Sequence, residues 1–99
     1  MRKLFYQKIA NEYLEYKSSV LMCTNKEIYG RSYEIEIMVN LYEIFLEIGE
    51  RLSNSVLTVL LSKQNILGWF YELWMTKDDN SYDKILACVN DELIKMNGR

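Results

Sequence analysis

Proline is absent from this chain of 99 residues, and glycine occurs only four times. Proline breaks the interior of a helix and glycine weakens it, so their scarcity favours long helices. Apolar residues recur every three or four positions, and no stretch shows the strict alternation of a half-buried strand. We therefore predict a single all-α domain over residues 1–99, folded as a compact bundle of about five helices with no sheet.

Local signals place the ends of these helices. The first helix is expected over residues 2–22, where apolar side chains share one face and Glu12 and Glu15 lie on the other. Thr24 and Glu27 form a capping box that starts a second helix near residue 25. Gly30 inside that helix marks a kink or a close contact, and Gly49 is expected to end it in a left-handed conformation.

The remaining helices begin after polar caps. Ser53 or Ser55 is expected to cap a third helix, which carries the apolar residues 56–61. The Gln64–Asn65 turn precedes a fourth helix over residues 66–74. A last helix follows a cap at Asn80 or Ser81 and keeps its apolar period to residue 93.

The stretch 33–52 is apolar around most of its circumference, which predicts a helix buried on more than one side. Such a helix is either central to the bundle or part of an interface with another chain. One apolar arc suits self-association: Ile35, Val39, Tyr42 and Leu46. The remaining acids form a strip that either keeps the helix solvated or docks a basic partner, and the residues expected to contact such a partner are Glu36, Glu43, Glu47, Glu50 and Tyr42.

Two further groups have structural interpretations. Glu34 falls within the apolar arc, so it needs a partner such as Arg31, Lys26 or a tyrosine hydroxyl. Cys23 and Cys88 lack the spacing of a metal site and are expected to act as small hydrophobic residues, although a disulfide between them stays open.

No catalytic signature is present. Without histidine the chain lacks the commonest general base, and no glycine-rich phosphate loop exists. The acid pairs Glu12–Glu15 and Glu47–Glu50 leave a magnesium-dependent nucleotide hydrolase as a remote alternative. We predict no enzyme, no cofactor and no metal site.

Charge and hydropathy limit the partners. Residues 1–31 have a net charge of +3, and the remainder has −5, so neither part has the dense basic patch that nucleic-acid binding requires. The aromatic residues of the fourth helix predict a core face and argue against DNA reading. No apolar run reaches the length of a membrane span, and no export signal is evident, so we expect a cytoplasmic protein.

From residue 27 onward the chain resembles a family of short proteins without assigned function from Firmicutes and their phages and mobile elements. The resemblance rests on the segments EIYGRSYEIEI, VLTVLLS, ILGWFYELW and YDKIL. The chain departs from the family pattern at Ser32, at Val39–Asn40 and at Ile66. The resemblance implies an all-α protein of bacterial or phage origin, and small acidic proteins of this origin resemble anti-CRISPR inhibitors.

Together these features predict a non-catalytic protein-binding module. In its most concrete form it is an inhibitor from a phage or mobile element that docks on a basic, nucleic-acid-handling host protein such as a Cas effector. The alternative is a helical homodimer with a structural or regulatory role.

Overall fold

The computed structural model describes residues 1–75 and 82–97, and this part of the chain is helical without a strand. Its elements are α1 (Arg2–Leu21), α2 (Asn25–Gly30), α3 (Ser32–Ile48), the 3₁₀ turn η1 (Gly49–Arg51), α4 (Asn54–Leu61), α5 (Ile66–Trp74) and α6 (Tyr82–Asn97). The predicted all-α bundle is confirmed. It has one more helix than expected, because the predicted second helix is divided at Arg31 into α2 and α3.

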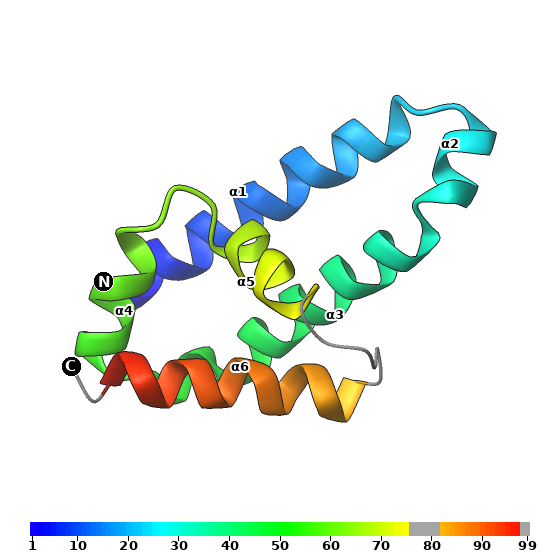
Figure 1. The fold of residues 1–99 in the computed structure, drawn as a ribbon. Helices are drawn as coiled ribbons and strands as arrows, with labels where there is room; N and C mark the ends of the chain where they lie inside the picture. The colour runs from blue at the N-terminus through cyan, green and yellow to red at the C-terminus, as the bar shows by residue number, and fades with distance from the viewer. Residues whose placement is uncertain (76–81, 98–99) are drawn as a thin grey trace.

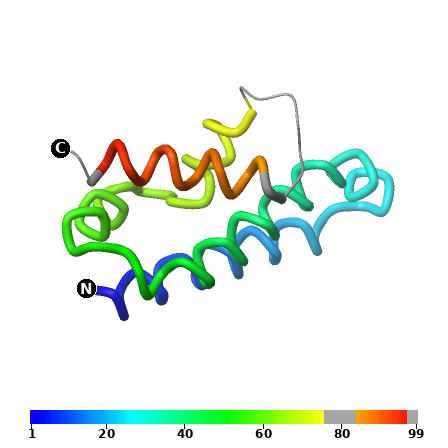
Figure 2. Tube along the Cα trace, turned by 90° about the horizontal axis from the view of Figure 1, so that it is seen from below, coloured from blue at the N-terminus to red at the C-terminus, as the bar shows by residue number. Residues whose placement is uncertain are grey.

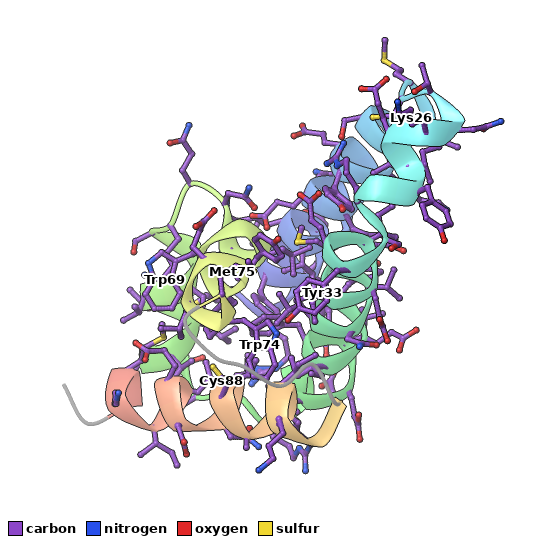
Figure 3. All side chains as sticks on the ribbon, turned by 45° about the vertical axis from the view of Figure 1, so that its right-hand side comes forward. Lys26, Tyr33, Trp69, Trp74, Met75 and Cys88 are labelled. Carbon is purple, nitrogen blue, oxygen red and sulfur yellow. The ribbon has the colours of Figure 1, made fainter. Side chains whose placement is uncertain are left out.

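The helices form a layer of two and a group of three. Helices α1 and α3 run side by side in opposite directions along the lower edge of Figure 2, and α4, α5 and α6 pack on the inner side of this pair. The far ends of α1 and α3 extend beyond the other helices and are joined through α2 (Figure 1). Lys26 lies at the tip of this extension, away from the core (Figure 3).

Helix α3 is the centre of the bundle, as the apolar stretch 33–52 predicted. It packs against α1, α5 and α6 and buries six of its own side chains. The ring of Phe45 meets Phe5 of α1 with 5.9 Å between centroids, and Phe70 of α5 with 5.0 Å. These edge-on contacts join three helices at one point, and each adds about 0.5–1.5 kcal/mol beyond the apolar area that it buries.

The N-terminal caps predicted at Thr24 and Ser53 are confirmed, and the predicted turn at Gln64–Asn65 supplies a third. The Glu27 amide donates to Thr24 Oγ1 at 3.2 Å, and the Thr24 amide donates to Glu27 Oε1 at 3.1 Å, so the capping box is complete. Ser53 caps α4, and Asn65 caps α5 by accepting from the Gly68 amide at 3.0 Å. The expected cap at Asn80 or Ser81 lies outside the described residues.

Helix α3 ends at Ile48, next to Gly49 as predicted, but the left-handed conformation predicted for Gly49 was wrong. Its φ of −54° is right-handed, and the chain continues from α3 into η1. The glycine is explained by proximity instead, since a Cβ at this position would lie 2.6 Å from Cζ of Tyr6. A side chain at residue 49 would therefore collide with the ring that α1 places against this turn.

Candidate protein-binding surface

The predicted acidic strip lies on the outside of the bundle. Its carboxylates belong to α3 and η1, all four side chains are exposed, and we call them the acidic ridge: Glu36, Glu43, Glu47 and Glu50. Glu50 accepts a hydrogen bond from Tyr6 Oη at 3.2 Å, which holds this end of the ridge against α1. Burial and the neighbouring Glu50 carboxylate both raise the pKa of the Tyr6 phenol, so it stays a neutral donor.

An apolar strip lies beside the ridge on the same helix: Ile35, Val39 and Leu46. Ile35 and Val39 are half-buried, whereas Leu46 is 44% exposed. Tyr42 falls on the same side, but its ring is stacked on Tyr13 of α1 at 4.3 Å with an angle of 13° between the planes. Tyr42 therefore fixes α3 against α1, and only its half-exposed remainder is available to a partner.

The predicted partner of Glu34 is confirmed as Arg31. Arg31 Nε donates to Glu34 Oε2 at 2.7 Å, and the guanidinium lies 5.6 Å above the ring of Tyr16. Arg31 also donates to Cys23 Sγ at 3.2 Å. This half-buried group joins the end of α1 to the start of α3, and the Glu34 carboxylate raises the pKa of Arg31, which stays charged. Cys23 and Cys88 are half-buried and are not joined by a disulfide.

Glu12 was wrongly placed on an outer face. Its carboxylate, only 11% exposed, accepts from the Ile66 and Leu67 amides at 2.9 Å each and also lies 3.4 Å from Lys8 Nζ. Free amides at a helix start attract negative charge, so Glu12 of α1 binds the first turn of α5. The sequence around residue 66 could not predict the hydrogen bonds to Glu12, because this acceptor lies more than 50 positions away.

The acid pairs considered for magnesium are not assembled into a larger group. Glu12 is held by the backbone of α5, while Glu50 is hydrogen-bonded to Tyr6. Among residues 1–75 and 82–97, no group of three or more His, Cys, Asp or Glu residues is arranged to hold a metal ion.

The aromatic side chains of α5 are mostly packed inside. Phe70 and Trp74 are buried, and Trp74 points into the bundle (Figure 3). Trp69 is half-buried, and Lys63 Nζ lies over its ring at 3.8 Å from the centroid in a cation–π contact. The predicted core role of this stripe is confirmed for the two buried rings. No helix in the described segments is long and apolar enough to cross a bilayer.

Comparisons with protein-family models, curated proteins and solved structures gave no match to this chain.

Proposed function

We propose that this protein is a non-catalytic protein-binding module whose acidic ridge contacts a basic protein surface. The observation that carries the proposal is the position of the ridge. Four exposed carboxylates follow one another along α3 and η1, and the helical period places them beside the apolar strip. Charges of one sign steer a partner of the opposite sign into place, and neighbouring apolar side chains supply buried area once contact is made.

The resemblance to proteins of phages and mobile elements suggests a narrower form of this function. A basic surface is typical of proteins that handle nucleic acids, and a small acidic protein can cover such a surface. In this form the protein inhibits a host nuclease, a Cas effector among them. The acidic ridge would then occupy positions that normally meet phosphates.

The test is charge reversal on the ridge. We expect the E43K/E47K variant to lose at least tenfold in affinity for a basic partner, in biolayer interferometry against purified nucleic-acid-handling proteins that include Cas nucleases. Binding of the natural protein should weaken from 50 to 300 mM salt, because added ions screen exposed charges. The matched control is E72K/D91K, which reverses two exposed acids on α5 and α6.

The result that overturns the proposal is equal binding by E43K/E47K and the natural protein. Far-ultraviolet circular dichroism of each variant shows whether the fold is retained. Equal loss in the E72K/D91K control would mean that net charge, rather than the ridge, governs binding.

A further inference from the structure

The outer sides of α1 and α3 carry a seven-residue repeat. On α3, Ile35, Val39, Tyr42 and Leu46 are separated by four, three and four positions, and acids recur seven apart at residues 36, 43 and 50. On α1 the same spacing joins residues 3, 7, 10, 14, 17 and 21, which read Lys, Gln, Ala, Leu, Lys and Leu. The α3 positions are all apolar, as in helices that pack along another helix, whereas on α1 only Ala10, Leu14 and Leu21 are apolar.

Nothing in the described chain covers this side of the layer. Helices α4, α5 and α6 all pack on the opposite side of α1 and α3 (Figure 2). Three leucines of the repeat are exposed to solvent, with exposed fractions of 58% for Leu14, 76% for Leu21 and 44% for Leu46. Aligned apolar side chains left open by the bundle are a feature of interaction surfaces.

The charges of this face complement one another. The cations Lys3 and Lys17 lie on α1, whereas the carboxylates of the acidic ridge lie on α3 and η1. We propose that a second copy of this chain covers the face, with α1 of each copy lying over α3 of the other. This dimer goes beyond the proposed function: it uses Glu36 and Glu50 at the two ends of the acidic ridge, and a foreign partner would have to displace the second copy.

The register of α1 against α3 aligns the charges. Because α1 and α3 are antiparallel, two residues at the same height along the layer have numbers with a constant sum. Tyr13 stacks on Tyr42 and Tyr6 donates a hydrogen bond to Glu50, so this sum is about 55. Lys3 therefore lies near the height of Glu50, and Lys17 near that of Glu36. A two-fold axis parallel to the helices preserves these heights, so each lysine of one copy meets the corresponding carboxylate of the other. The two lysines are 14 residues apart, and so are the two glutamates, which corresponds to about 21 Å along a helix.

The charges also select this axis over the other one. A two-fold axis perpendicular to the helices would lay α1 on α1 and α3 on α3, which brings like charges together. The parallel axis instead produces four helices in which each helix runs opposite to its two neighbours, the usual arrangement of an antiparallel bundle.

The size of the face indicates which class of interface it could form. Each copy contributes two helices, each about 25 Å long and about 10 Å wide, so the contact face of one copy covers about 500 Å². Both copies together bury about 1,000–1,200 Å², the lower limit of specific interfaces. An interface of this size suits a reversible dimer rather than a permanent one, so dissociation is tested at micromolar concentrations.

The experiment is sedimentation equilibrium on the full chain from 1 to 200 µM. We expect the natural protein to move from monomer to dimer over this range. K17E and E36K should each raise the dissociation constant at least tenfold, because each places like charges opposite one another. The double variant K17E/E36K exchanges the pair and should return the constant to within threefold of the natural value. The control D91K, an exposed charge on α6, should leave it unchanged.

A second pair of variants tests the apolar part. L46E should give monomers, while I94E, a change of the same kind at an exposed position of α6, should still dimerise. Circular dichroism confirms that each variant is folded. A natural protein that stays monomeric at 200 µM overturns the dimer; if it then binds a basic foreign protein through Glu43 and Glu47, the proposed function stands without it. A dimer that survives both K17E and L46E also overturns this interface.

Discussion

At the scale of single residues, Glu12 has the clearest structural role. Its carboxylate accepts from two amides of α5 that have no partner within their own helix. We expect Glu12→Ala to lower the free energy of unfolding by about 1–3 kcal/mol, because it leaves two partly buried donors without an acceptor. Urea denaturation measures the change. Glu15→Ala removes an exposed acid from the same helix and should cost less than about 0.5 kcal/mol; an equal loss in both variants would contradict the role of Glu12.

Tyr16 makes the free energy of unfolding depend on pH in the alkaline range. Burial, and then repulsion from Glu34, raise the pKa of its phenol to about 12, while Arg31 acts in the opposite direction. Between the ordinary pKa of 10.0 and about 12, the unfolded chain loses the proton and the folded chain keeps it. The contribution of Tyr16 to the free energy of unfolding should therefore be constant below pH 10. It should fall as the pH rises from 10 toward 12.

The test of this titration is Tyr16→Phe. The Tyr16 hydroxyl is buried without a hydrogen bond, so its removal should change stability at pH 8 by less than about 1 kcal/mol. Urea denaturation at pH 8 and pH 11 should show a smaller loss of stability in the variant than in the natural protein. Equal losses in the two proteins would mean that the pKa of Tyr16 is not raised in the folded state. Tyr6 and Tyr71 also have raised pKa values, but they are present in both proteins and contribute equally to both losses.

At the scale of helices, the glycines have opposite roles. A Cβ added at Gly30 would meet no neighbouring side chain within 4 Å, and this glycine keeps a negative φ at the end of α2. Gly30→Ala should therefore raise the free energy of unfolding by about 0.4–1 kcal/mol, because alanine restricts the unfolded chain. Thermal unfolding followed by circular dichroism measures the shift, and a lower melting temperature would show that the break between α2 and α3 requires glycine.

Gly49→Ala should act in the other direction. The added methyl group would displace the ring of Tyr6 and break its hydrogen bond to Glu50, at a cost of about 1–3 kcal/mol. The same substitution in a Tyr6→Ala background should cost less than in the natural protein, since the ring is then absent. A cost that is equal in both backgrounds would place the strain elsewhere in η1.

At the scale of the whole molecule, stability depends on the meeting of three helices at Phe45. Its side chain is fully buried between Phe5 and Phe70. Phe45→Ala should cost about 3–5 kcal/mol, a large part of the roughly 5–15 kcal/mol that stabilises an ordinary domain. We expect circular dichroism to show a melting temperature lower by about 12–40 °C. Tyr29→Ala, at an exposed position of α2, should keep the natural melting temperature; an F45A variant that also keeps it would contradict the central place of this residue.

Features that depend on neighbours along the chain could be read from the sequence. The caps at Thr24, Ser53 and Asn65 each join groups three residues apart, so the sequence contains both partners. The Arg31–Glu34 pair is local in the same sense. The burial of α3 could also be predicted, because a helix that is apolar around most of its circumference must be covered on several sides.

Features that depend on distant segments were decided by the tertiary structure. A helical pattern gives the direction of a side chain around its own axis, but it does not say where the next helix lies. The contact of Glu12 with α5, 54 positions away, therefore has no signal in the sequence around it. The helix end at Gly49 could be predicted, but the reason for a glycine there is the ring of Tyr6 rather than a left-handed conformation. The heights of Lys3 and Lys17 relative to Glu50 and Glu36 likewise depend on how α1 packs against α3.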